Sequence, residues 1–450
     1  MTGDRSRLLV DTVRRLLRRG AHANLRKIVN KSHAGDLSVV FRAIGPQERN
    51  TLFSMLEDLE TKGTLLSESE GDALLRLVET LSVDELVGIL ETLASDDAAD
   101  IIGQLPEELS QAVLKKMSRE GSQEIEGLLG YEDDTAGGIM VTDFVAVSEN
   151  DTARQVIESL QREHHDVEMP FYLYVVDDNG RLTGVSSLRQ LVVHAAETPI
   201  RDFMTRDVLS VRTDMDQEEV ARIVARYDIL AVPVVDADNK LVGIITVDDV
   251  IDIIREEATE DILKMAGVGE EFVETQSFAR STRIRAPWLF ASCMGGILAS
   301  LIISHFSVSL QKVAYLAAFI PVIMGMGGNV GTQSSTIVVR GLATGRLQVS
   351  NLWKVLFKEL RVGVTLGILY GAVVGFVAHL GREGWALSLA VGLAMICSMS
   401  LAAVVGSVLP LGFARVHIDP AVATGPFVTT SVDVLSVFFY FEIATMLLGI

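Results

Sequence analysis

Asp433 is an isolated acidic side chain in the last apolar segment of the chain, Ala421 to Leu448, where only Glu442 also carries a charge. About 20 apolar residues span the roughly 30 Å hydrocarbon layer of a bilayer. An ionised group at that depth costs at least about 2–3 kcal/mol, so it normally faces water or another polar group. Three hydroxyls lie three or four residues away on the same helical face: Thr429, Thr430 and Ser436. We interpret Asp433 as functional; the structural alternatives are a carboxylate satisfied by these hydroxyls or one at the lipid boundary.

A second apolar segment, Val313 to Leu342, carries a polar run that is unusual for a lipid-facing helix. Pro321 removes a backbone hydrogen bond, and the glycines after it loosen the helix further. The run comprises Gly325, Gly327, Gly328, Asn329, Gly331, Thr332, Gln333, Ser334, Ser335 and Thr336. Gly425 and Pro426 precede Asp433 in the same way, so the sequence predicts two kinked segments with freed carbonyls that face protein or water. Close helix packing through small residues is the alternative for the glycines, but it does not explain the amides and hydroxyls.

Carbonyls, hydroxyls and one carboxylate form an all-oxygen environment. Such donors suit a hard cation such as Mg²⁺, whereas Zn²⁺ and Cu²⁺ favour His and Cys. Mg²⁺ loses water reluctantly, so a site here would hold the hydrated ion with Asp433 against its water shell. A symmetric dimer would bring two copies of Asp433 to a shared axis and balance the divalent charge.

The charge of the chain is unevenly distributed. The net charge is −20 over 450 residues. From Ile284 onward there are 9 Lys and Arg against 5 Asp and Glu, a net of +4, so the first 283 residues carry −24. An acidic half joined to an apolar half argues against nucleic acid and for cations as partners. The cysteines, Cys293 and Cys397, have no metal-binding or disulfide-type spacing.

Hydropathy predicts five membrane-spanning segments in the second half of the chain. They are Trp288 to Phe306, Val313 to Leu342, Leu356 to Leu380, Ala386 to Leu411, and Ala421 to Leu448. Basic side chains gather in the connections between the second and third segments and between the fourth and fifth. They are Arg340, Arg346, Lys354, Lys358 and Arg361, then Arg415 and His417. This bias predicts a cytoplasmic N-terminal half and a C-terminus outside.

The acidic half begins with short amphipathic helices up to about Leu129. Leu, Ile and Val recur at three- and four-residue spacing, punctuated by helix-start signals such as Ser82-Val83-Asp84-Glu85. This rhythm predicts a small superhelical array of helices.

From Ile139 to Glu257 strands alternate with helices, and the pattern occurs twice. The stretch Tyr174 to Val185 matches the stretch Pro233 to Ile244, 59 residues later. Each copy predicts a strand, a tight turn, a second strand and a helix. The tandem resembles a pair of cystathionine-β-synthase (CBS) domains.

The nucleotide-contact pattern of CBS domains is complete only in the second copy, at Gly243, Thr246 and Asp249; Gln190 replaces the Asp in the first copy. The resemblance therefore makes Thr246 and Asp249 candidates for binding a nucleotide such as ATP. The alternative is a turn Thr and a helix-start Asp with no ligand.

The second copy runs into a helix with excess acid. Asp249, Asp252 and Glu256 share one face, and like charges at this spacing destabilise a helix by a few tenths of a kcal/mol per pair. Either this stripe is solvated, or a cation bridges it to another acidic surface. The uncompensated acid in this helix, and in Asp96, Asp97 and Asp100, makes a cation bridge a competitive interpretation.

Along nearly its full length the chain resembles the MgtE family of magnesium channels and transporters. The motifs are Pro321 with Gly325-x-Gly327-Gly328-Asn329-x-Gly331-x-Gln333-Ser334, then Arg340-x-Leu342-Ala343-Thr344, Asp419-Pro420 with Pro426 and Asp433, and Tyr131-Glu132-x-Asp134-x-Ala136-Gly137-Gly138-x-Met140. The resemblance implies a multi-domain membrane protein. Its parts would be a superhelical α-helical N-domain (1–130), tandem α/β CBS domains (131–256, with copies at 139–200 and 204–256), a connecting plug helix and linker (248–284), and a five-helix transmembrane domain (285–450).

The resemblance also implies a homodimer in which Asp433 holds hydrated Mg²⁺ in the pore. The pore-lining residues would be Gly325, Gly328, Asn329, Thr332, Gly425 and Thr429. Cytosolic Mg²⁺ would bind between acidic surfaces and close the pore with the connecting helix. The sensor residues would be Asp96, Asp100, Glu218, Asp228, Asp249, Asp252, Glu257, Glu260 and Asp261. Thr332 and Gly425 depart from members that carry Asn near the pore, and Glu442 has no role in the family pattern.

We therefore expect a channel or transporter of the bacterial plasma membrane that mediates Mg²⁺ influx and is closed by cytosolic Mg²⁺. The alternatives are a secondary transporter of divalent cations such as Mg²⁺ and Co²⁺, and a channel regulated mainly by ATP at the CBS pair. An enzyme is not expected, because the sequence has no Walker A or HExxH motif and the histidines of the membrane half are scattered.

Overall fold

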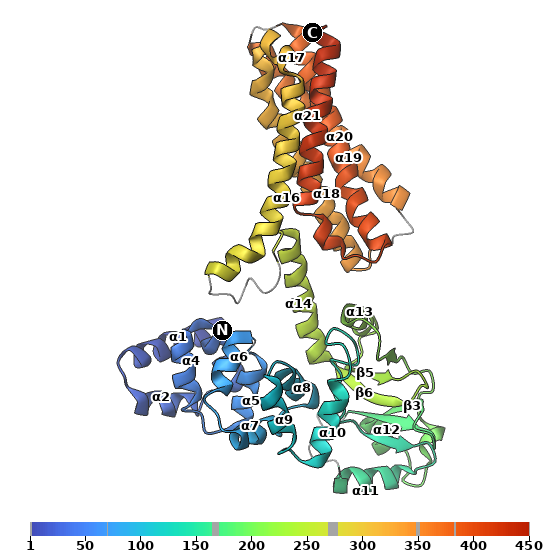
Figure 1. Cartoon of the computed structure of the whole chain (residues 1–450). Helices are drawn as coiled ribbons and strands as arrows, with labels where there is room; N and C mark the ends of the chain where they lie inside the picture. The colour runs from blue at the N-terminus through green and yellow to red at the C-terminus, as the bar shows by residue number, and fades with distance from the viewer. Residues whose placement is uncertain are drawn as a thin grey trace. The chain divides into compact units, whose positions relative to one another are not determined.

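The computed structural model describes residues 2–69, 71–163, 171–268, 278–347, 352–381 and 384–449. These form two compact units, Met1–Ile253 and Ile254–Ile450 (Figure 1). Residues 269–277, within the connecting stretch predicted at 248–284, lie outside the described residues.

Short helices form the first part of the first unit. They are α1 (Thr2–Arg18), α2 (His22–Val29), α3 (Ala34–Ala43), α4 (Pro46–Phe53), α5 (Leu59–Ser67), α6 (Gly71–Val78), α7 (Val83–Leu90), α8 (Ser95–Gly103), α9 (Glu107–Leu114) and α10 (Arg119–Leu128). The Ser82 hydroxyl accepts from the Glu85 N–H and the Glu85 carboxylate from the Ser82 N–H, which caps α7 at the predicted start. Leu37, Leu65 and Leu86 are among the buried residues of a shared core. The predicted array of amphipathic helices is confirmed.

Each CBS-like repeat contains a three-stranded sheet whose middle strand pairs with one parallel and one antiparallel neighbour. The first contains β1 (Ala146–Ser148), α11 (Ala153–Glu163), β2 (Tyr172–Val176), β3 (Leu182–Ser187), α12 (Leu188–Val193) and the 3₁₀ helix η1 (Ile200–Asp202); the second contains β4 (Val211–Arg212), α13 (Gln217–Tyr227), β5 (Ala231–Val235) and β6 (Leu241–Thr246). The β2–β3 and β5–β6 turns match, and each contains a residue with left-handed backbone conformation. It is Gly180 (φ 77°) in the first turn and Asn239 (φ 64°) in the second.

The two repeats contact each other through matching Gly and Met positions. A methyl group on Gly184 would lie 2.6 Å from Met204 Sδ, and one on Gly243 would lie 2.7 Å from Met140 Sδ. The methyl group on Gly243 would also lie 2.9 Å from the Val141 carbonyl oxygen, and a backbone atom cannot move aside as a methionine side chain can, so glycine is required there. Gly243, part of the predicted nucleotide pattern, is thus explained by the packing of one repeat on the other.

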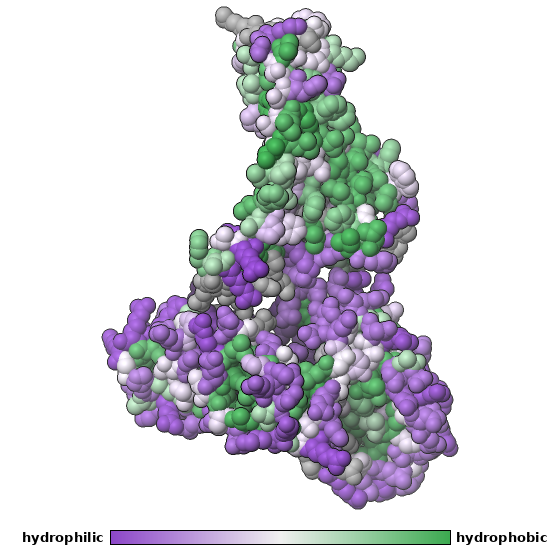
Figure 2. Space-filling model, viewed as in Figure 1, coloured by the Kyte–Doolittle hydropathy of each residue, from purple (hydrophilic) through white to green (hydrophobic). Residues whose placement is uncertain are grey.

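The second unit has, among its described residues, five helices long and apolar enough to cross a membrane, which confirms the five predicted segments. They are α16 (Phe278–His305), α18 (Ile320–Ala343), α19 (Leu352–Leu380), α20 (Trp385–Arg415) and α21 (Pro426–Leu448), with α17 (Ser307–Lys312), η2 (Ala314–Phe319) and η4 (Pro420–Ala423) between them. The acidic helix α14 (Val247–Met265) begins in the first unit and ends in the second. Exposed apolar side chains form the hydrophobic surface of the membrane helices in Figure 2, as lipid contact requires.

The helix α20 is largely buried, and α19 packs closely against it. Gly363, Gly367, Gly371 and Gly375 recur every four residues on the buried face of α19. A methyl group on Gly363 would lie 2.8 Å from the Met399 carbonyl oxygen, so the stripe lets the two backbones approach.

The kinks predicted at Pro321 and Pro426 are wrong. Pro321 lies in the first turn of α18 and Pro426 begins α21, where a backbone N–H has no partner within the helix in any case. The prolines therefore begin helices, and the apolar segment from Ala421 is divided between η4 and α21. Gly327 and Gly331 lie within the continuous helix α18 and pack against α20 and α21, so close packing accounts for both.

Candidate functional site

Asp433 lies in the third turn of α21, about one turn before the middle of the helix. Its side chain is partly buried beside α18, where a methyl group on Gly328 would lie 3.9 Å from Asp433 Oδ1. Glycine therefore leaves space next to the carboxylate. Within the described parts of the chain, no side chain donates a hydrogen bond to Asp433. The carboxylate thus keeps its capacity to accept hydrogen bonds from water or to face a cation.

The three hydroxyls expected near Asp433 are directed elsewhere. The Thr429 hydroxyl donates to the Gly425 carbonyl at 3.3 Å. Thr430 packs against Gly295 of α16, and the Ser436 hydroxyl lies 2.7 Å from the Ser398 hydroxyl of α20. Of the three, only the Ser436 hydroxyl bonds to another helix, and none of them donates a hydrogen bond to the described Asp433 carboxylate.

One face of α18 combines polar residues with exposure. Gly325, Asn329, Thr332 and Thr336 recur at three- and four-residue spacing and are all exposed, and Gly328 is partly exposed beside them. This face holds four of the predicted pore-lining residues and includes the position next to Asp433. Exposed amides and hydroxyls at membrane depth require water or protein against them.

The end of α14 packs against the start of α21. The Lys264 ammonium forms ion pairs with Glu260 and with Asp419, whose Oδ2 is 2.6 Å away. A methyl group on Gly425 would lie 3.2 Å from the Met265 carbonyl oxygen. Gly425, predicted to line the pore, therefore lies at the contact with α14, and the predicted sensor Glu260 is paired with a lysine.

Glu359 is a buried carboxylate that the sequence did not single out. It is only 4% exposed, and it accepts a hydrogen bond from the Ser334 hydroxyl of α18 at 3.0 Å. Lys358 and Arg361 lie close to it in sequence, so Glu359 resembles part of the charged loop between two membrane helices. The signal that identifies it is its register, since Glu359 continues the four-residue stripe of Gly363 and Gly367 onto the buried face.

Asp249 lies near an acidic side chain of the N-terminal helices. Its carboxylate accepts from the buried Thr246 hydroxyl at 2.5 Å, and burial raises its pKa. Burial, with the nearby carboxylates of Asp249 and Glu68, raises the pKa of Asp97 on α8 to about 6. Asp97 is therefore the acid that faces Asp249, although the family resemblance pointed to Asp96 and Asp100. The Asp96 carboxylate accepts from the Asp97 N–H at 2.9 Å.

The other predicted sensor residues are spread over several elements. Glu218 is ion-paired with Arg222 at 3.0 Å, and Asp228 is the left-handed residue that ends α13. Asp252, Glu257 and Asp261 follow along α14. The described ranges contain no group of three or more His, Cys, Asp or Glu side chains close enough to hold a metal ion.

A cleft of about 460 Å³ lies between the two CBS-like repeats. It is lined by Tyr172, Tyr174, Val185, Asp207, Val208, Leu209, Tyr227, Ile229, Ala231 and Pro233. The buried Tyr174 hydroxyl has no hydrogen-bond partner among the described residues. The predicted nucleotide residues Thr246 and Asp249 do not line this cleft, and they are bonded to each other.

A five-helix membrane unit with an interior carboxylate, joined to acidic helices and a CBS-like tandem, defines a membrane transport protein. The chain belongs to the MgtE family. Residues 320–443 match the family of divalent cation transporters named MgtE, and residues 32–134 match the MgtE intracellular N domain. Residues 136–197 and 200–256 match the CBS domain.

Magnesium transporters named MgtE are similar to this chain over most of their length. The chain is 40% identical to that of Thermus thermophilus over 328 residues, or 72% of each protein. It is 32% identical to that of Bacillus subtilis over 431 residues, or 96% of this chain and 95% of the other. The solved cytosolic domain of the Mg²⁺ channel MgtE in complex with ATP has a TM-score of 0.50 and 36% identity, and covers 54% of this chain and 99% of that one. The predicted family and multi-domain membrane architecture are confirmed.

Proposed function

We propose that this protein conducts Mg²⁺ through a path lined by α18 and α21, with Asp433 as the residue that holds the hydrated ion. The observation that carries the proposal is the partly buried Asp433 carboxylate next to Gly328, with space beside it. A carboxylate that has space for water beside it suits a hard cation that retains its hydration shell.

The polar face of α18 supports a homodimer. Asn329, Thr332 and Thr336 are exposed in the single chain at membrane depth. Two such faces around a shared axis would enclose water and bring two Asp433 carboxylates to one divalent ion, which balances the charge.

Basic connections support the orientation and place proposed for the protein. Arg340 lies near the end of α18, Lys354 near the start of α19, and Arg415 at the end of α20. These helix ends are on the same side of the membrane if each helix crosses it once. The positive-inside bias puts this side in the cytoplasm of a bacterial cell, with the protein in the plasma membrane and its C-terminus outside.

Reconstitution tests the transport function. The purified full chain in liposomes should admit Mg²⁺ down its gradient, followed with a Mg²⁺-sensitive dye inside the vesicles. A channel needs no second gradient, so dissipating H⁺ and Na⁺ gradients should leave the rate unchanged. A rate that collapses without one of these gradients would favour the secondary transporter instead.

Gating by cytosolic Mg²⁺ is supported by the acidic contact at the start of α14. The Asp249 carboxylate is close enough to raise the pKa of Asp97, so a bound cation would relieve the repulsion. The same helix ends at Met265, and its Lys264 is ion-paired with Asp419, shortly before α21. Mg²⁺ that fixes the first end of α14 would thereby favour its docked position at the second.

Asp97→Asn should stabilise the metal-free protein near neutral pH. The folded pKa of Asp97, about 6, lies above its unfolded value, so ionisation costs stability as pH rises from about 4 to 6 and the full cost persists above that. Removing the charge should raise Tm by about 2–4 °C at pH 7.5 and by less at pH 5. Mg²⁺ should then stabilise the variant less than the parent. Thermal unfolding measures this; the exposed Asp178→Asn is the control, and a lower Tm for Asp97→Asn would contradict the proposal.

ATP is the second regulator that we propose, bound in the cleft between the repeats. A base stacked on an aromatic ring gains about 1–3 kcal/mol, so Tyr172→Ala should weaken ATP binding by about tenfold or more. Asp249→Asn should leave ATP binding unchanged, because Asp249 lies outside the cleft. Calorimetry on the full chain separates the two. If Asp249→Asn loses ATP binding and Tyr172→Ala does not, ATP binds at Thr246 and Asp249 and not in the cleft.

A further inference from the structure

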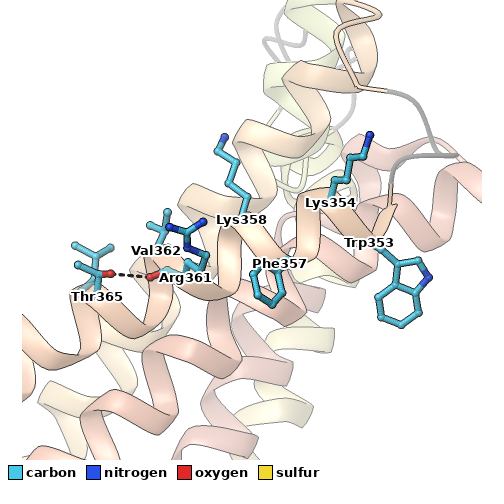
Figure 3. Close-up of a pocket in the computed structure, with 8 residues that line it drawn as sticks. Trp353, Lys354, Phe357, Lys358, Arg361, Val362 and Thr365 are labelled. Atoms are coloured by element: carbon cyan, nitrogen blue, oxygen red, sulfur yellow. Dashed lines mark hydrogen bonds between the residues drawn. The ribbon is translucent and has the colours of Figure 1, made fainter.

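A basic groove runs along the first three turns of α19, apart from the proposed Mg²⁺ path. Lys354, Lys358 and Arg361 line it with the aromatic side chains of Trp353 and Phe357, and its volume is about 820 Å³. In Figure 3 the two lysines extend from the same side of the helix. Trp353 is 81% exposed and Phe357 is 65% exposed, so this face of the helix is open.

The opposite face of α19 fixes this orientation. Glu359 is buried against Ser334 of α18, and Gly363 and Gly367 sit against α20. Turning α19 to bury its basic side chains would expose Glu359 and drive the glycine stripe away from α20. The basic and aromatic residues therefore face outward because of the packing on the inner side.

The groove lies where the charged part of α19 gives way to an apolar part. After Arg361 no Asp, Glu, Lys or Arg occurs up to Leu380, a stretch about 28 Å long as a helix. Ile368, Val373 and Phe376 are exposed along that stretch. This length matches the hydrocarbon layer, so the groove lies at the boundary with the lipid headgroups.

Two of the three basic groups of the groove have no acidic partner among the described residues. In the described part of the chain, Lys354 and Arg361 form no ion pair with a carboxylate. Lys358 lies 3.8 Å from Glu359 Oε1, but Glu359 is engaged with Ser334. The groove therefore suits a molecule that has both negative charge and an apolar body.

We propose that this groove binds an anionic phospholipid. The phosphate headgroup would lie between Lys354, Lys358 and Arg361, with the rings of Trp353 and Phe357 beside it at the headgroup boundary. The acyl chains would extend along Val362 and Leu366, which also line the groove. Basic side chains at a membrane surface attract anionic lipid, and aromatic rings at the same depth favour the headgroup boundary.

Quenching of Trp353 by brominated lipids tests the proposal. The full chain has three tryptophans, so Trp288→Phe with Trp385→Phe leaves Trp353 as the only reporter. In liposomes that contain brominated phosphatidylglycerol or brominated phosphatidylcholine in an unbrominated background, we expect about a tenfold preference for the anionic lipid at Trp353. Lys354→Gln with Lys358→Gln and Arg361→Gln should remove that preference. The charge-conserving variant Lys354→Arg, Lys358→Arg, Arg361→Lys should keep the preference, which separates loss of charge from misfolding.

Three results would overturn the proposal. Equal quenching by both brominated lipids would show that the groove does not select the anionic headgroup. Loss of the preference on adding inorganic phosphate would identify a site for a soluble anion. Absence of quenching by either lipid would mean that a second copy of the chain covers Trp353. Lys312→Gln, on the short helix α17, is the control for general surface charge.

Discussion

Replacing Asp433 with Asn is expected to reduce Mg²⁺ flux in liposomes by at least about a hundredfold, and Asp433→Ala should do the same. The carboxylate is partly buried, and no described residue competes for it, so its charge is available to the ion. A divalent ion near a single charge in this environment gains several kcal/mol, and a barrier to passage that is higher by about 3 kcal/mol corresponds to a hundredfold in rate.

The same helix supplies a matched control for this experiment. Glu442 is the other carboxylate of α21 and is exposed nine residues further on. Glu442→Gln should keep flux close to that of the parent, whereas Asp433→Glu should keep part of it because the charge remains. Normal flux in Asp433→Asn would refute the pore assignment. An equal loss of flux in Asp433→Asn and Glu442→Gln would show that α21 is sensitive to any change of charge, and that Asp433 has no particular role.

The membrane helices were predictable from the sequence, but their starts were not. Hydropathy over about 20 residues identifies a span, because the bilayer demands that length. It does not locate the first helical residue, which decides whether a proline bends a helix or begins it. Pro321 and Pro426 were predicted as kinks for that reason, although each lies in a first turn.

The parts of the candidate site that the sequence did not identify depend on contacts between distant segments. Glu359 is bonded to a serine 25 residues away on another helix. Asp97 lies near Asp249, which comes about 150 residues later in the chain. Asp433, in contrast, was recognisable because a charge in an apolar segment is unusual wherever its partners lie. Local chemistry was therefore enough to single out Asp433 as a candidate, whereas the proximity of Asp97 to Asp249 needed the fold.

The double variant Asp249→Asn, Asp252→Asn is expected to conduct at high Mg²⁺ on the side of the first unit. Asp249 opposes Asp97, and Asp252 follows one turn later on α14. Without these charges the cation has fewer ligands, and removing each charge-assisted interaction weakens binding by about 1.5–3 kcal/mol. The Mg²⁺ concentration that half-closes the channel should rise by at least about tenfold, measured by single-channel recording with nucleotide absent.

The design of this experiment separates closure by Mg²⁺ from other causes. Asp178→Asn with Asp238→Asn removes the same net charge from two exposed turns and should close like the parent. Recording without nucleotide excludes the ATP cleft as the source of closure.

If the acidic double variant closes at the usual Mg²⁺ concentration, the acidic residues Asp97 and Asp249 are not the sensor. Closure would then have to arise at the other end of α14, where Lys264 already provides a fixed cation between Glu260 and Asp419. That ion pair needs no Mg²⁺, so the proposed dependence of docking on Mg²⁺ rests on the acidic residues at the start of the helix.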